Sequence, residues 1–233
     1  MTDFSKECVC FLPCRKGSQR IPRKNVKPFA GYKFGLLEIK LQQLLESKLV
    51  RRIVLTTDDS EILEFASSLK EHKIQLHERS ANLSSSETST DKLVSHALEL
   101  IPEGHILWTH VTSPFITAAN YDSIIEVYHE KLLSGYDSLM SVTPLRSFLW
   151  QQGRPLNYDR EVEKWPRTQT LLPVHEVNSG VFLAPSDVYR KHSDRIGSAP
   201  FLFEMDSITS HDIDWSADFE IAECLVERGL AKV

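Results

Sequence analysis

Residues 15–27 carry six basic side chains and no acidic one, although the whole chain has a formal net charge of −5. The six are Arg15, Lys16, Arg20, Arg23, Lys24 and Lys27. Such a segment suits a polyanion, because Arg and Lys donate charge-assisted hydrogen bonds to phosphate oxygens. Gly17 lets the backbone approach an anion closely, and Ser18 adds a hydroxyl. The segment therefore predicts a phosphate-binding loop, and a solvated basic loop or a nucleic-acid patch is the alternative.

Two carboxylates spaced by one residue stand near the other end of the chain. In an extended segment alternate side chains point to the same side, so Asp212 and Asp214 can converge on one cation while Ile213 faces the core. Mg²⁺ prefers oxygen ligands and is commonly shared between one or two carboxylates and substrate phosphates. Asp212 and Asp214 are therefore the predicted ligands of Mg²⁺, with Mn²⁺ as the other candidate.

The elements that must position these residues follow an α/β pattern. Short apolar runs alternate with amphipathic stretches, as in βαβ units around a mainly parallel sheet. The predicted strands are 8–12, 52–56, 74–77, 105–110, 138–142 and 177–183. Helical periodicity predicts helices at 37–45, 121–132 and 215–230. Because the basic segment follows the first strand, we expect it at the carboxyl edge, where open α/β sheets bind ligands.

The length and composition fit one α/β domain spanning residues 1–233, with 41% hydrophobic and 25% charged residues. Residues 144–176, rich in proline and tryptophan, interrupt the pattern, so we expect an excursion that covers a site or mediates self-association. The net charge gives no reason to expect a nucleic-acid or membrane partner. Since no stretch approaches the roughly 18 apolar residues of a membrane span, we expect a cytoplasmic protein. Neither the Walker pattern nor G-x-G-x-x-G occurs.

Residues 12–25, LPCRKGSQRIPRKN, resemble the N-terminal signature of the CMP-sialic acid synthetase family, also called the acylneuraminate cytidylyltransferases. The matching residues, in family order, are Pro13, Arg15, Gly17, Ser18, Ile21, Pro22, Lys24 and Asn25. Cys14 replaces the usual alanine, and Lys16 replaces a glycine. The resemblance implies that the CTP-binding residues are Arg15, Gly17, Ser18, Lys24 and Asn25.

Two further segments resemble nucleotide-binding parts of the family. Arg79 is the implied nucleotide contact in the first of them. Ser89 and Asp91, downstream, either serve the site or only cap a helix. Asp58 and Asp59 end the second predicted strand, where an acid is either a site residue or a structural helix cap.

Residues 108–116, WTHVTSPFI, resemble the family segment Leu-Gln-Pro-Thr-Ser-Pro, with His110 in place of the Gln that contacts the acceptor sugar. A buried structural histidine is the alternative for His110. In the resemblance Arg167 pairs with the carboxylate of an acidic sugar, as a bidentate Arg does well. The implied substrate-binding residues are His110, Thr112, Ser113, Arg167 and Asn178.

The ordered resemblance covers residues 8–230 and implies a three-layer, nucleotide-binding α/β fold with 144–176 as a dimerisation or lid excursion. It implies that a sugar hydroxyl attacks the α-phosphorus of CTP and displaces pyrophosphate, with a homodimer as the working form. The implied catalytic residues are Arg15, Lys24, Asp212 and Asp214. The expected acceptor is a nonulosonic, sialic-acid-like sugar. The alternatives are a Kdo-type or sugar-1-phosphate nucleotidyltransferase, a nucleotide-sugar glycosyltransferase, or a nucleotide-binding protein without turnover.

Overall fold

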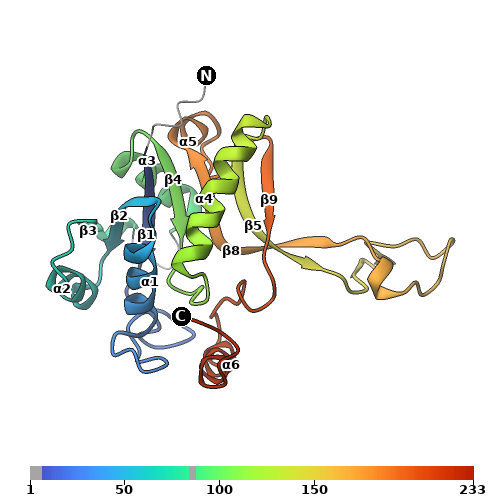
Figure 1. The fold of residues 1–233 in the computed structure, drawn as a ribbon, viewed down its shortest axis with the longest axis horizontal. Helices are drawn as coiled ribbons and strands as arrows, with labels where there is room; N and C mark the ends of the chain where they lie inside the picture. The colour runs from blue at the N-terminus through green and yellow to red at the C-terminus, as the bar shows by residue number, and fades with distance from the viewer. Residues whose placement is uncertain (1–6, 84–87) are drawn as a thin grey trace.

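A seven-stranded sheet forms the centre of the computed structural model, which describes residues 7–83 and 88–233 (Figure 1). The strand order is β3-β2-β1-β4-β8-β5-β9. The strands are β1 Cys8–Cys14, β2 Val50–Thr57, β3 Ile74–Glu78, β4 His105–Thr109, β5 Ser138–Leu145, β8 Val174–Pro185 and β9 Pro200–Glu204. β8 runs antiparallel to β4 and β5, and every other pair in this sheet is parallel. The predicted, mainly parallel sheet is thus confirmed.

Helices cover both faces of the sheet and make the predicted three layers. They are α1 Gly35–Glu46, α2 Ser60–Ser68, α3 Thr90–Leu100, α4 Ala118–Leu133, α5 Ser186–His192 and α6 Ser216–Glu227. Along β1 the side chains alternate, so that Cys10 and Leu12 join the core with α1, α2 and α4, while Val9 and Phe11 join the core with α3 and α5. Within the described ranges, no helix has the length and apolar character of a membrane span.

The six predicted strands are all present, and most extend beyond their predicted ends. β9 and α5 are additional elements that the periodicity does not predict. In β9 four of the five residues are half-buried, so no clear alternation marks it as a strand. α5 has only seven residues, which is too short for a helical pattern to stand out.

Residues 146–173, which we call the arm, connect β5 to β8 and project away from the sheet (Figure 1). The arm lies inside the predicted excursion and contains the short strands β6 Trp150–Gln151 and β7 Arg154–Pro155 and the 3₁₀ helix η2 Thr168–Thr170. Its aromatic rings pack on one another: Phe148 lies 5.2 Å from Tyr158 and 5.3 Å from Trp165, centroid to centroid.

Gly35, the first residue of α1, provides a sharp test of this fold. Its φ is +51°, and a Cβ at this position would overlap the carbonyl oxygen of Lys27. Gly31 also has a positive φ, +87°, but no described atom lies within 4 Å of a Cβ placed there. We expect Gly35→Ala to lower the free energy of unfolding in urea by about 3 kcal/mol or more, and Gly31→Ala by about 1 kcal/mol. Equal effects of the two substitutions would contradict the close packing of α1 on the basic loop.

Candidate active site

The basic segment forms the loop between β1 and α1, at the carboxyl edge of the parallel strands. Three buried apolar side chains, Ile21, Val26 and Phe29, anchor this loop in the core that α1 and α4 cover. Gly17 has φ +81°, a backbone conformation that glycine adopts at little cost. Because these anchors alternate with cations, most of the basic side chains stay at the surface, where they can meet an anion.

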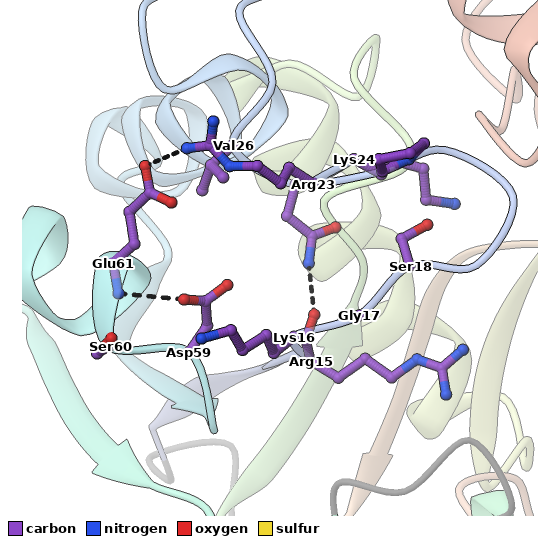
Figure 2. Close-up of a pocket in the computed structure, with 12 residues that line it drawn as sticks. Arg15, Lys16, Gly17, Ser18, Arg23, Lys24, Val26, Asp59, Ser60 and Glu61 are labelled. Atoms are coloured by element: carbon purple, nitrogen blue, oxygen red, sulfur yellow. Dashed lines mark hydrogen bonds and ion pairs between the residues drawn. The ribbon is translucent and has the colours of Figure 1, made fainter.

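The loop and the start of α2 enclose a cavity of about 560 Å³, the loop cavity (Figure 2). The residues predicted to bind CTP that line it are Arg15, Gly17, Ser18, Lys24 and Asn25. Asn25 Nδ2 donates a hydrogen bond to the carbonyl of Arg15 at 3.2 Å, which ties the start of the loop to a residue ten positions later. The structure therefore brings these predicted nucleotide-binding residues to one cavity.

Asp58 and Arg79 follow β2 and β3 and hold the loop through its backbone. Asp58 Oδ1 accepts a hydrogen bond from the backbone N–H of Lys16 at 2.7 Å and lies 3.6 Å from Arg79 Nη2. Arg79 is buried and donates to the carbonyl of Cys14 at 2.9 Å. Asp59 is the N-cap of α2, as its structural alternative predicted. The nucleotide contact of Arg79 stays a prediction.

The segment after Arg79 is described only in part, because residues 84–87 lie outside the described ranges. In the described part, the Ser89 hydroxyl accepts a hydrogen bond from the backbone N–H of Lys92 at 3.4 Å and caps α3. Asp91 lies in the first turn of that helix, where a carboxylate is favourable. Ser89 is thus the N-cap of α3, as the capping alternative predicted, whereas Asp91 lies one residue inside the helix rather than at the cap.

The loop and the Asp-x-Asp segment meet directly, although they are about 190 residues apart in the sequence. Arg20 Nη2 donates to Asp214 Oδ1 at 2.8 Å. Lys24 Nζ donates to the carbonyl of Ile213 at 2.6 Å and lies 3.4 Å from the same Asp214 oxygen. The cationic loop and the acidic segment are thus adjacent, but the two aspartates do not line the cavity that the loop forms, so one shared site stays a prediction.

Asp212 and Asp214 both line a second cavity, of about 510 Å³, which we call the acidic cavity. Ile213 between them is fully buried, as the alternation predicted. The remaining lining residues are Thr143, Glu176, Val177, Asn178, Ser179, Ser207, Ser210 and His211. Polar groups therefore cover most of the wall beside the two carboxylates.

The two aspartates fit a divalent cation whose remaining ligands come from substrate phosphates and water. Asp212 Oδ1 is buried and has no hydrogen-bond partner among the described residues, so this oxygen is available to coordinate a metal ion. Burial raises the pKa of Asp212, the Thr112 hydroxyl opposes this shift, and Asp214 adds to it. No group of three or more His, Cys, Asp or Glu suited to a metal occurs in the described ranges. Two carboxylates without a full cage suit Mg²⁺, which commonly takes its other ligands from phosphates and water.

His110, just after β4, contributes to a third cavity of about 360 Å³, the central cavity, whose wall also includes Arg15, Ser18, Lys24 and Thr112. Both ring nitrogens already have partners. Trp108 Nε1 donates to His110 Nε2 at 3.0 Å, so His110 Nδ1 carries the proton and donates to the carbonyl of Ser179 at 2.9 Å. Burial lowers the pKa of His110 to about 4. These contacts support the structural alternative for His110, and its predicted role in acceptor binding stays a prediction.

Comparison with known proteins decides which family this geometry belongs to. The model of the family described as Cytidylyltransferase matches residues 9–214, which include the basic loop and both aspartates. The chain belongs to the cytidylyltransferase family. It is therefore a nucleotidyltransferase, and its relatives support the resemblance of its motifs to the CMP-sialic acid synthetase family.

Two relatives and two solved structures are similar to this cytidylyltransferase. The pseudaminic acid cytidylyltransferase of Campylobacter jejuni is 26% identical over 93% of this chain and 95% of its own length. The N-acylneuraminate cytidylyltransferase of Escherichia coli is 25% identical over 94% of this chain and 52% of its own. The structure of CMP:2-keto-3-deoxy-manno-octonic acid synthetase complexed with CTP has a TM-score of 0.66 and 16% identity, and the match covers 96% of this chain and 99% of that one. The 4-diphosphocytidyl-2C-methyl-D-erythritol synthase of Anaerococcus prevotii has a TM-score of 0.64 and 14% identity, and the match covers 96% of this chain and 97% of that one.

Lys40 supports the cytidylyltransferase site and is absent from the sequence-based prediction. It lies on α1, is fully buried, and Nζ donates to Gln43 Oε1, the Ser113 carbonyl and Tyr121 Oη at 2.7 to 2.8 Å. Burial lowers the pKa of Lys40 to about 7. Through its bond to the Ser113 carbonyl, the Lys40 ammonium holds the turn that follows β4 beside the central cavity. The signal was available, because Lys40 stands three residues after Leu37 on the apolar stripe of its helix.

The other residues predicted to bind the acceptor sugar do not lie together in one cavity of the cytidylyltransferase. The side chain of Ser113 is buried, and Ser113 does not line the three cavities described above. Asn178 lines the acidic cavity, and its Oδ1 accepts from Ser141 Oγ at 2.6 Å. Arg167 lies on the projecting arm and does not line these cavities within one chain. Its assignment to an acceptor carboxylate stays a prediction.

Proposed function

We propose that this cytidylyltransferase transfers CMP from CTP to a nonulosonic acid and releases pyrophosphate. The observation that carries the proposal is the direct contact of the basic loop with the Asp-x-Asp segment, through Arg20 and Lys24 to Asp214. One site thereby offers cations for a triphosphate and carboxylates for a divalent metal. The names of relatives that act on pseudaminic and N-acylneuraminic acids support the acceptor class.

The reaction needs charge neutralisation and alignment rather than a covalent intermediate. A new bond forms between the acceptor hydroxyl oxygen and the α-phosphorus, the bond from that phosphorus to the bridging oxygen breaks, pyrophosphate leaves, and the hydroxyl proton passes to water. Arg15 and Lys24 would neutralise the triphosphate, while Ser18 and Asn25 would contact it from the loop cavity. Asp212 and Asp214 would hold Mg²⁺ or Mn²⁺, which supplies charge stabilisation at the phosphates when bound.

The acidic cavity is the proposed position of the acceptor. Hydroxyl groups of Thr143, Ser207 and Ser210 line it and can bond sugar hydroxyls. Glu176 and the two aspartates also line it, so the carboxylate of an acidic sugar needs a nearby cation. We assign that role to the partner's Arg167, brought by an arm from a second copy of the chain.

Exposed apolar side chains on the arm support a homodimer. Those with at least 45% exposure are Trp150, Leu156, Val162, Trp165 and Leu172. All five belong to one short projecting segment, so the arm is a candidate for burial against another copy. Sedimentation equilibrium of the whole chain tests this, since a mass of one chain at micromolar concentration contradicts it.

Pyrophosphate release in the presence of CTP, Mg²⁺ and a panel of acceptors tests the proposed function. The panel contains sialic, legionaminic, pseudaminic and Kdo-type acids together with a sugar 1-phosphate. We expect turnover with at least one nine-carbon acid and none with the sugar 1-phosphate. Turnover restricted to the Kdo-type acid or to the sugar 1-phosphate would favour the corresponding alternative. Stoichiometric CTP binding without turnover on any acceptor would favour a protein that only binds nucleotide.

A further inference from the structure

Arg20 contacts two consecutive residues of the C-terminal segment, Asp214 and Trp215, and the function proposed above assigns it no step in the reaction. Its Nη2 donates to Asp214 Oδ1 at 2.8 Å, and its guanidinium carbon lies 5.0 Å from the centroid of the Trp215 ring. Asp218 Oδ2 accepts hydrogen bonds from the backbone N–H groups of Asp214 and Trp215, at 3.0 and 2.7 Å. The turn at the start of α6 thus presents a carboxylate and an aromatic face side by side to one cation.

The contacts of Asp214 Oδ1 are already full without a metal. The oxygen accepts from Arg20, and the ammonium of Lys24 lies 3.4 Å away. A divalent cation on the same carboxylate would bring a third positive group to one place, and like charges at a few ångströms repel. A metal on Asp214 is therefore favoured when one of the two side chains moves away.

Arg20 is the side chain that can move. Lys24 is tied to the carbonyl of Ile213, and its side chain is only 10% exposed. Arg20 is 43% exposed, and its neighbour Trp215 is 61% exposed. Exposed ion pairs contribute little free energy, so their exchange costs little. Arg20 also lines the central cavity beside Arg15 and Ser18, where a triphosphate would offer it new acceptors.

We propose that Arg20 is an internal counter-ion of Asp214, which occupies the carboxylate in the nucleotide-free enzyme and moves to the triphosphate when the metal binds. The inference rests on the proposed metal role of Asp214. Arg20 thereby lowers the affinity of the empty enzyme for the metal and couples metal binding to CTP binding. By linkage, the metal increases CTP affinity by the same factor as CTP increases metal affinity.

The experiment measures Mn²⁺ binding to the nucleotide-free, full-length protein by electron paramagnetic resonance of free Mn²⁺. We expect Arg20→Gln to bind Mn²⁺ about five- to tenfold more tightly than the unsubstituted protein, because the substitution removes both a competing ion pair and a close-range repulsion of the ion. The double variant that combines Arg20→Gln with Asp214→Asn should not show this tighter binding, because the ion is expected to bind at Asp214.

Arg23→Gln is the matched control, because it removes the same charge from the same loop. Arg23 pairs with Glu61 at the start of α2 and has no described contact with Asp214. We expect its Mn²⁺ affinity to stay within about twofold of the unsubstituted protein, since Arg23 is exposed, pairs with Glu61 and is screened by salt. Equal tightening in the Arg20 and Arg23 variants, or no tightening in Arg20→Gln, would overturn the proposal.

Calorimetric titration with CTP in EDTA and in Mg²⁺ provides a second readout. The factor by which Mg²⁺ increases CTP affinity should be several-fold smaller in Arg20→Gln than in the unsubstituted protein, because the competing cation is already gone. An unchanged factor contradicts the coupling. If the unsubstituted protein releases pyrophosphate with an acceptor while both readouts are unchanged, the proposed function stands and the counter-ion role of Arg20 is wrong.

Discussion

Asp214→Ala is expected to lower kcat for CMP transfer by at least about a thousandfold, equivalent to roughly 4 kcal/mol of transition-state stabilisation. The Asp214 carboxylate accepts contacts from the loop cations Arg20 and Lys24 and is a proposed ligand of the metal. Its side chain is 45% exposed, so its ion pairs contribute at most about 1 kcal/mol to stability. Turnover should therefore be lost while the fold remains. Steady-state kinetics with saturating CTP and acceptor, together with urea unfolding, measure the two effects.

Asp187→Ala is the control for the Asp214 substitution. The Asp187 carboxylate pairs with Arg190 on α5 at 2.6 Å, and its side chain is 82% exposed. We expect kcat within about twofold of the unsubstituted enzyme, since exposed pairs of this kind contribute little. Full activity in Asp214→Ala would remove the metal assignment, whatever the Asp187 variant shows.

Lys24→Ala should have the second largest effect, a decrease in kcat/KM for CTP of about a hundredfold or more. The lysine side chain is nearly buried and lines both the loop cavity and the central cavity. Removing it takes a cation from the proposed triphosphate site. It also leaves the carbonyl of Ile213 without its Lys24 donor, which should cost about 1–3 kcal/mol of unfolding free energy.

Two further variants separate charge from position at Lys24. Lys33→Ala removes an exposed cation of the same loop, which lies 5.9 Å from the Phe34 ring, and should leave kcat/KM within about twofold. Lys24→Arg keeps the charge but changes the shape of the donor, so we expect partial activity. Unchanged kcat and KM in Lys24→Ala would contradict the proposed phosphate-binding role of the loop.

Much of the fold could be predicted because its signals are local. The strands are short apolar runs between amphipathic stretches, and burial of β1 on both faces agrees with its unbroken apolar sequence. The alternation of Asp212, Ile213 and Asp214 placed two carboxylates on one side and an apolar anchor on the other. Ser89 was offered as a helix cap because Ser favours that position, and the structure places it there.

Other features depend on contacts between distant segments. β9 is mostly half-buried and pairs with the edge of β5, so its position follows from neighbours rather than from its own pattern. Lys40 is a charged residue in the core, satisfied by Ser113 and Tyr121, which are more than 70 residues away. His110 has both nitrogens bonded within the protein, one of them to Ser179, a contact that only the pairing of β4 with β8 creates.

The amino-acid sequence by itself determined the chemistry available to this cytidylyltransferase: a cationic loop after the first strand, and two carboxylates presented together near the end of the chain. Periodicity and residue type carry that information, since both act over a few neighbouring residues. Only the tertiary structure decided which cation meets which carboxylate. Of the six loop cations, Arg20 and Lys24 are the two that bond Asp214, and Lys24 also bonds the backbone carbonyl beside it. Such pairings depend on how β1 and the segment before α6 lie in space, which no local pattern encodes.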